Sequence, residues 1–444
     1  MTVYDYAHIG HGRKYVGDDI LRRTLIRFGY EITHVQNVTD VGHLVSDADT
    51  GEDKLEKGAE KQGKTVWEVA EFFTKHFYDS MDSLNILRPT IICKATDHIP
   101  EQIQLVKTLI EKGYAYDTQE AVYFNVTRFP KYGSLFGGQK LEEKKVGARD
   151  EVKTGEHKQN PADFVLWFKR VGRFSDHTMH WDSPWGDGFP GWHIECSAMS
   201  MKYLGETFDI HTGGIDHIPV HHPNEIAQSE AATGKPFVKY WVHYAFLTVD
   251  GKKMSKSLGN FYTVDEVRTK GFDPLALRYF YLTAHYRKPL NFTWESLTAA
   301  KNSLVELRLQ IARLKESDRK SLSSEKLDKV DVYRAKFNNA LSDDMNTPQA
   351  LAVAWEVVKS NIPAPDKYDL LLDFDEVLGL RISEVPSDES IGTEIPQDVA
   401  DLVHKREKLR KEKKFADADA VRDSIEEKGF ILEDTSEGLR VKRK

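Results

Sequence analysis

The stretch MTVYDYAHIGHGRKY (residues 1–15) decides the fold, because His8-Ile9-Gly10-His11 has the form of a turn between a strand and a helix. Such turns lie at the nucleotide-binding edge of a parallel sheet. Gly10 lets the backbone approach a ligand closely, and the free N–H groups of a following helix bind phosphate. Arg13 and Lys14 would add positive charge there. Taken alone, the string is weak support, since two surface histidines at a turn explain it equally well.

Beyond this turn, helical and strand patterns alternate along the chain. Residues 19–30 have helical periodicity, and residues 31–40 carry β-branched residues at strand spacing. This alternation predicts an α/β fold with a parallel sheet. Polar stretches near 43–64 and 138–162 indicate insertions, and from residue 273 onward the pattern becomes helical. A stretch rich in Pro, Ser and Gly around 380–396 indicates a linker before a last basic block, 397–444.

Composition narrows the class of protein. With 444 residues the chain exceeds one ordinary domain. Its formal charge of -8 means that any nucleic-acid contact must use local basic patches. The two cysteines, Cys93 and Cys196, exclude a disulfide scaffold and fit a reducing compartment. No apolar run approaches the ~20 residues of a membrane span. We therefore expect a cytoplasmic protein without a membrane partner.

A second string, GKKMSKSLGN (residues 251–260), strengthens the interpretation of the first string as part of a nucleotide-binding site. Lys253 and Lys256 lie three positions apart among hydroxyls and glycines, which predicts a mobile cationic loop. Such a loop can follow the charge that develops on a transferring phosphorus. By itself the string also fits an ordinary solvated turn. The two strings in this order, on either side of a β–α region, are much less expected by chance.

HIGH followed by KMSKS resembles the paired signature of class I aminoacyl-tRNA synthetases. Further segments narrow the resemblance to the cysteinyl-tRNA synthetase family; they include SPWGDGFPGWHIECSAM, DIHTGGIDHIPVHHPNEIAQSEA, KMSKSLGNF and FADADAVRDSIEEKGFILED. The likeness extends from Thr2 to the last residues. It implies a Rossmann-like parallel-sheet catalytic domain over 1–272, followed by an all-helical C-terminal region. That region would comprise a helical bundle, 273–380, and a basic domain that binds the tRNA anticodon, 397–444.

A metal site is suggested by HHPNEIAQSEA, where Pro223 fits the first turn of a helix. His221 and Glu225, four positions apart, would converge on one face of that helix. With the thiolate of Cys196 they form a donor set that suits zinc. The alternative is that Cys196 packs as a small buried apolar residue and His221 is an ordinary loop histidine. Position alone does not separate His222 from His221, and the family pattern selects His221.

The resemblance implies a role for zinc, because an enzyme of this family must discriminate cysteine from serine. A hydrophobic pocket gains only ~1–3 kcal/mol from such small differences, whereas zinc binds a thiolate directly. The family's zinc has a fourth ligand, an early cysteine that would precede Thr2, and Cys93 is expected to be packing. We therefore expect roughly 20–30 residues upstream of Met1, which end in Cys-Gly and provide this ligand and a first strand.

The family also implies roles for the remaining site residues. The cysteine pocket would be formed by Thr2, Trp192 and His193. Adenosine and its ribose would be held by Gly213, Gly214 and Asp216. The ATP phosphates and the reacting phosphorus would be contacted by His8, Gly10, His11, Lys253 and Lys256.

The resulting expectation is a monomeric ligase that uses ATP with Mg²⁺ to form cysteinyl-adenylate. It then transfers cysteine to the 3′ end of tRNA(Cys). Two alternatives remain open: a ligase that delivers cysteine to an amino-sugar, and a non-catalytic tRNA-binding paralogue. The helical region and basic tail argue against the first, and the two intact motifs argue against the second.

Overall fold

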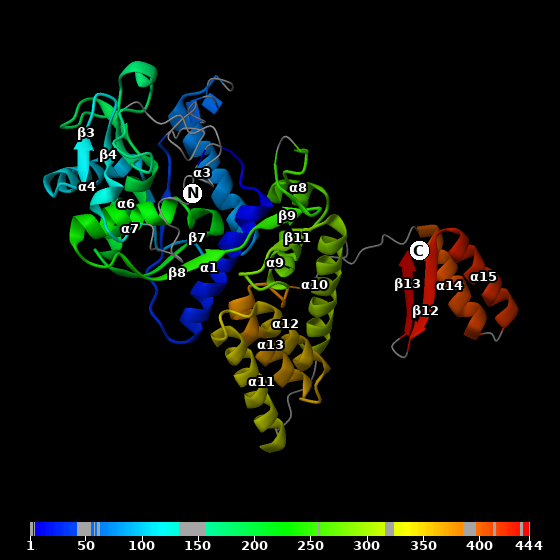
Figure 1. Cartoon of the computed structure of the whole chain (residues 1–444). Helices are drawn as coiled ribbons and strands as arrows, with labels where there is room; N and C mark the ends of the chain where they lie inside the picture. The colour runs from blue at the N-terminus through cyan, green and yellow to red at the C-terminus, as the bar shows by residue number, and fades with distance from the viewer. Residues whose placement is uncertain are drawn as a thin grey trace. The chain divides into compact units, whose positions relative to one another are not determined.

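Figure 1 shows the computed structural model of the chain. The structure describes residues 3, 5–41, 55–56, 58–59, 63–132, 157–255, 258–315, 324–384, 397–411, 414–435 and 438–443. Two compact units make up the chain: 1–304 with 318–381, and 305–317 with 382–444. Most residues of the two predicted polar insertions lie outside the described ranges. The predicted domain boundaries at 272 and 380 stay predictions.

The first unit contains the parallel strand pairs of an α/β fold. β1 (Val35–Val38) pairs in parallel with β2 (Ile91–Lys94), and α3 (Val66–Ser83) lies between them in the chain. β7 (Phe208–Gly214) pairs in parallel with β8 (Val238–Tyr244), and α7 (His221–Thr233) lies between these two. Parallel neighbours need such helical crossovers. The predicted Rossmann-like α/β class is confirmed.

An antiparallel sheet supports the helices that carry the site. Its order is β3 (Ala115–Asp117), β4 (Ala121–Phe124), β5 (Phe164–Lys169) and β6 (Gly188–Pro190). Its apolar residues form one buried core with α4 (Ile99–Glu111), α6 (Trp192–Leu204) and α7. At Gly191, where α6 begins, a Cβ would lie 2.2 Å from the carbonyl oxygen of Val165, so only glycine lets the chain turn there.

A further sheet leads into the KMSKS string, and two short helices follow it in the chain. The sheet has the order β10 (Lys252–Lys253), β9 (Leu247–Val249) and β11 (Leu290–Phe292). α8 (Val264–Thr269) and α9 (Pro274–Leu282) follow the string. Cys93 is buried on β2 with Val41, Ala95 and Met199, which agrees with its expected packing role.

The predicted helical region begins with α10 (Trp294–Lys315) and α11 (Ser324–Ser342) and continues with α12 (Thr347–Lys359) and α13 (Ala364–Leu378). The last three pack against one another (Figure 1). Stacked rings of Phe337 and Phe374, with centroids 3.9 Å apart, fill the space between α11 and α13. None of the helices in the described ranges combines the length and the apolar content that a bilayer crossing requires.

The second unit corrects one part of the prediction. α14 (Gln397–Lys411) and α15 (Phe415–Glu427) are helical as expected, but β12 (Phe430–Thr435) and β13 (Gly438–Arg443) form an antiparallel hairpin. The expectation of an all-helical C-terminal region is therefore wrong for these last residues. Phe430 and Leu432 are only 4% and 2% exposed, packed with Val399 and Ile425. Residues two apart share a face in a strand but not in a helix.

The first unit is held by an ion pair at its centre. Asp19 of α1 (Ile9–Arg27) and Arg278 of α9 are both fully buried, with Nη2 and Oδ2 2.6 Å apart. Arg278 also donates to the carbonyl oxygens of Leu84 (3.0 Å) and Leu378 (2.7 Å). Gly379 leaves room for it, since a Cβ there would lie 2.6 Å from the guanidinium.

Replacing Arg278 by alanine should lower the free energy of unfolding by about 3 kcal/mol, because it leaves buried acceptors without their donor. This is the lower end of the usual range, since Arg23 still contacts Asp19. Urea denaturation measures the change. Lys75→Ala, which removes an exposed pair with Asp79, is the control and should cost less than ~1 kcal/mol. Equal losses in the two variants would contradict the central role of Arg278.

Candidate active site

The HIGH turn forms the N-terminus of α1, with His8 as its cap. The Nδ1 of His8 accepts the N–H of His11 at 3.2 Å, and the Nδ1 of His11 accepts the N–H of His8 at 3.4 Å. The two rings stack with centroids 3.6 Å apart. Because each Nδ1 is an acceptor, each neutral ring carries its proton on Nε2. The turn therefore offers two Nε2–H donors beside the free N–H groups of a helix start, which together suit an anion.

The KMSKS string lies against this turn. A Cβ on Gly10 would lie 2.9 Å from the His8 ring and 3.1 Å from the Cε of Met254, so a larger residue would displace one of these side chains. The N–H of Ile9 donates to the carbonyl of Tyr262 at 2.9 Å. Two motifs far apart in sequence thus meet in one place.

Only part of the cationic loop is described. Lys253 is exposed on β10, whereas Lys256 lies outside the described residues. Asn260 bridges the loop, because its Oδ1 accepts the N–H of Ser255 (2.8 Å) and its Nδ2 donates to the carbonyl of Lys253 (3.2 Å). This bridge fixes the backbone that carries Lys253.

Arg13 does not face the predicted phosphate site. Its Nη1 donates to the carbonyls of Ala245 (3.0 Å) and Phe246 (2.5 Å), and its Nη2 donates to those of His285 (3.4 Å) and Lys288. Burial lowers its pKa to about 10, so it stays charged at neutral pH. The expectation that Arg13 adds charge for a phosphate is wrong, because backbone carbonyls already take up its donors.

The predicted metal ligands come together from two packed helices. Cys196 lies on α6, and His221 and Glu225 lie on the first turns of α7. All three are buried, and one donor atom from each lies within 4.8 Å of the others. Within the described residues a second group, His211, His222 and Glu225, meets the same criterion and shares the carboxylate. His211 Nε2 lies 3.1 Å from Glu225 Oε1.

The donor set fits zinc. Zinc binds sulfur at ~2.3 Å and nitrogen at ~2.0 Å, so its ligands lie a few ångströms apart, as these do. Burial raises the pKa of the Cys196 thiol well above its ordinary value, and the charges of Glu225 and Glu195 raise it further. A cation between these groups would remove that electrostatic cost. A thiolate in the set favours the group with Cys196 over the group of His211, His222 and Glu225 for zinc.

Two side chains that the sequence did not indicate contact these ligands. Asn37 of β1 donates from Nδ2 to Cys196 Sγ at 3.5 Å, and His211 contacts Glu225. His193, expected beside the substrate, is buried with its Nδ1 2.9 Å from the Nδ1 of His221. One of these nitrogens must donate, which fixes the ring nitrogen that His221 presents to the cluster. No local pattern could have indicated Asn37, because it arrives from a distant strand.

Of the residues predicted for the cysteine and adenosine pockets, Trp192 and Gly213 contact histidines of the cluster, and Thr2 lies outside the described residues. The Trp192 ring lies 4.3 Å from that of His221. Gly213, in the last residues of β7, lies against His222, where a Cβ would lie 2.5 Å from the ring. A Cβ on Gly214 would lie 2.2 Å from the Oδ1 of Asp216. These glycines therefore allow close approach of protein side chains as well as of any ligand.

Comparison with known proteins gives consistent matches. The family model described as the tRNA synthetases class I (C) catalytic domain matches residues 1–302, and the DALR domain model matches residues 336–361. The "Cysteine--tRNA ligase" of Treponema denticola is 46% identical over 459 residues, 98% of this chain and 92% of that protein. The "Cysteine--tRNA ligase" of Deinococcus radiodurans is 41% identical over 460 residues, 100% of this chain and 91% of that protein.

Solved structures are similar in fold. A methionyl-tRNA synthetase of Mycobacterium tuberculosis bound by methionyl-adenylate has a TM-score of 0.58 and 14% identity, covering 86% of this chain and 89% of that one. The LeuRS-tRNA-LeuAMS ternary complex of Agrobacterium radiobacter has a TM-score of 0.62 and 12% identity, covering 88% and 85%. At these identities the likeness shows the fold alone.

The neutral state of His8 leads to a pH dependence. Burial lowers its pKa from 6.5 to about 4, so between these values the unfolded chain binds more protons than the folded chain. This contribution to stability is present above pH 6.5 and is lost as the pH falls toward 4. His8→Gln should reduce the loss of unfolding free energy between pH 7 and pH 5, measured by urea denaturation. His157→Gln, at an exposed histidine, should leave that loss unchanged; an identical effect of both variants would contradict the assignment.

Proposed function

We propose that the chain, which belongs to the cysteine--tRNA ligase family of class I aminoacyl-tRNA synthetases, activates L-cysteine with ATP and attaches it to the 3′ end of tRNA(Cys). The contact between Gly10 and Met254 carries the catalytic part of this proposal, because it joins the two class I motifs in one site. The curated relatives, 46% to 40% identical and named for cysteine, carry the choice of amino acid.

Catalysis would depend on positioning and charge rather than on a protein nucleophile. A carboxylate oxygen of cysteine attacks the α-phosphorus of ATP, and the bond to pyrophosphate breaks. The Nε2–H groups of His8 and His11 donate to phosphate oxygens as neutral donors. Lys253 and Lys256 provide the positive charge that follows the departing pyrophosphate. A ribose hydroxyl at the 3′ end of tRNA then attacks the activated carbonyl and releases AMP.

For substrate selection we assign Cys196, His221 and Glu225 as ligands of a zinc ion. Bound there, zinc would supply a Lewis acid that prefers a thiolate to a hydroxyl. Trp192 would form one wall of the cysteine pocket, with Thr2 near the amino group. His193 would hold the ring of His221 in place.

Adenosine and tRNA would occupy the remaining surfaces. Gly213, Gly214 and Asp216 would hold the nucleoside at the end of β7, and ATP would arrive with Mg²⁺. The C-terminal domain, 397–444, would contact the anticodon end of tRNA through the lysines and arginines of α14. We further propose that the protein acts as a monomer in the cytoplasm, where charged tRNA is used. The DALR match and the near full-length likeness to tRNA ligases favour tRNA over an amino-sugar as the acceptor of cysteine.

The purified chain should exchange pyrophosphate into ATP when cysteine is present and charge tRNA(Cys). Serine should support the exchange roughly 10⁴-fold less well, because a hydroxyl cannot replace a thiolate on a metal. Radiolabelled exchange and acid-precipitable tRNA charging measure the two steps. Exchange without charging would indicate the amino-sugar ligase. Absence of both activities would indicate the non-catalytic paralogue.

Replacing Cys196 by serine should lower the zinc content and reduce cysteine-dependent exchange at least ~10²-fold, because a hard hydroxyl replaces a soft thiolate. Zinc is measured by atomic emission on the purified protein. Cys93→Ala is the matched control, since the second cysteine lies in a separate apolar cluster, and it should keep zinc. Loss of zinc in His222→Gln with full zinc in Cys196→Ser would instead assign the metal to the group of His211, His222 and Glu225.

A further inference from the structure

The turn between α11 and α12 has an unusual backbone. Asp344 and Met345, two adjacent residues other than glycine, both have a φ of 54°. Such left-handed residues cost about 1–3 kcal/mol each and persist only where their surroundings impose them. Here Asn346 donates its N–H to the carbonyl of Ala340 (2.9 Å), and Thr347 donates to that of Met345 (2.7 Å). The geometry places the carboxylate of Asp344 outside both helices.

That carboxylate binds the segment that follows α9. Tyr286 donates its hydroxyl to Oδ1 of Asp344 at 2.6 Å, and Nε of Arg287 lies 2.5 Å from Oδ2. Nη2 of Arg287 donates to Oδ1 at 3.2 Å. Burial alone would raise the pKa of Asp344, but the contacts from Arg287 and Tyr286 outweigh it and hold the pKa below its ordinary value.

The same segment is held from its other side by the HIGH helix. Arg13 of α1 donates to the carbonyls of His285 and Lys288, which flank the two residues that Asp344 binds. The carbonyl of Tyr286 accepts the N–H of Ala245 at 2.9 Å, and Arg13 also holds the carbonyl of Ala245. Residues 285–288 therefore connect Asp344 with the helix that begins at His8.

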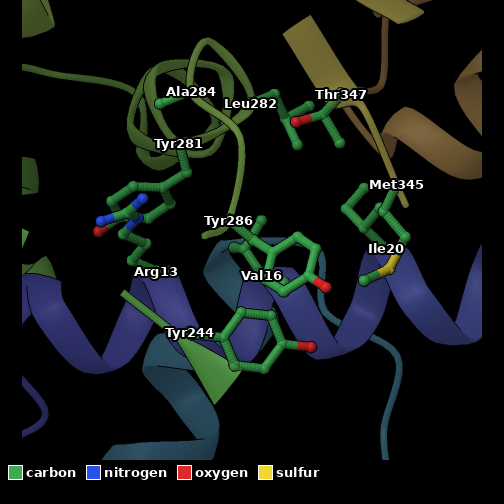
Figure 2. Close-up of a pocket in the computed structure, with 11 residues that line it drawn as sticks. Arg13, Val16, Ile20, Tyr244, Tyr281, Leu282, Ala284, Tyr286, Met345 and Thr347 are labelled. Carbon is green, nitrogen blue, oxygen red and sulfur yellow. The ribbon is translucent and has the colours of Figure 1, made fainter. Parts of the chain in front are cut away.

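Packing alone does not fix this segment, because a cavity lies beside it (Figure 2). The cavity measures about 30 Å³, enough for about two water molecules. The rings of Tyr244 and Tyr286, with Ile20 of α1 and Met345, surround it. Since Tyr286 borders open space, its polar contacts decide where it lies.

We propose that Asp344 is a positioning residue for adenylate formation, which acts through residues 285–288 on Arg13 and so on the HIGH helix. The inference rests on the proposed function, because it concerns the same site. A catalytic constellation loses rate when its donors shift by a fraction of an ångström. A carboxylate in the helical region would thus set the placement of His8 and His11.

A double-mutant cycle on the full-length chain tests this route. The variants are Asp344→Ala, Arg13→Lys and the double substitution, and the measurement is the maximal rate of cysteine-dependent ATP–pyrophosphate exchange. Asp344→Ala should lower this rate ~10-fold, with the Michaelis constant for cysteine and the zinc content unchanged. In the Arg13→Lys background the same substitution should lower the rate at least ~3-fold less, because the contacts between Arg13 and residues 285–288 are already disturbed.

Asp373→Ala is the matched control, because Asp373 is a half-buried carboxylate of the helical region that also pairs with α1, but through Arg27. Its effect should be the same in both backgrounds. If Arg13→Lys does not fold, Tyr286→Phe replaces it, since this change removes only the hydroxyl that contacts Asp344.

A further comparison separates the carboxylate from the strained backbone. Asp344→Gly accepts a φ of 54° without strain but lacks the carboxylate, so it should lose as much rate as Asp344→Ala. Asp344→Asn, which keeps an acceptor for Tyr286, should recover part of the rate. Equal effects of Asp344→Ala in both backgrounds, or full activity of Asp344→Gly, would overturn the proposal. A wild-type chain without exchange would instead overturn the proposed function.

Discussion

The buried pair of Asp19 and Arg278 is the contact on which the first unit depends. Asp19 lies in the middle of α1, and its Oδ1 also accepts the N–H of Leu87 at 2.8 Å. Through Arg278 the same carboxylate is tied to α9 and to the carbonyl at the end of α13. A buried ion pair contributes little net stability over apolar packing, but it fixes which groups must meet. This pair therefore fixes which groups meet the middle of α1.

Fixed in this way, α1 receives separate contacts along its length. Its N-terminal turn meets the KMSKS string through Gly10 and Met254. Arg13 donates to a carbonyl just after β8 and to a carbonyl in the segment after α9. Arg27 pairs with Asp373 of α13 at 2.8 Å. One helix thus links the HIGH turn to the helical region.

The sequence predicted the parts of the site that local spacing determines. His221 and Glu225 converge because residues four apart share a helical face, and the helix start was indicated by Pro223. Long-range contacts were not predictable. Nothing near Asn37 or His211 in the sequence indicates that each meets a ligand from another element. The hairpin at Phe430 was predicted to be helical, because the spacing of its charged residues fits the two-residue period of a strand as well as the 3.6-residue period of a helix.

In the proposed mechanism the histidines and the lysines have different tasks, because their charge states differ. Burial keeps His8 neutral at physiological pH, since its pKa falls to about 4. A neutral imidazole donates a hydrogen bond but cannot balance the charge that builds up as pyrophosphate leaves. Arg13 cannot balance it either, because its donors are bound to backbone carbonyls. In the proposed mechanism the lysines of the KMSKS string, together with the Mg²⁺ that accompanies ATP, would balance this charge. Gly10 brings the proposed donors next to this string, because a Cβ at that position would lie 3.1 Å from the Cε of Met254 and a larger residue would have to displace that side chain.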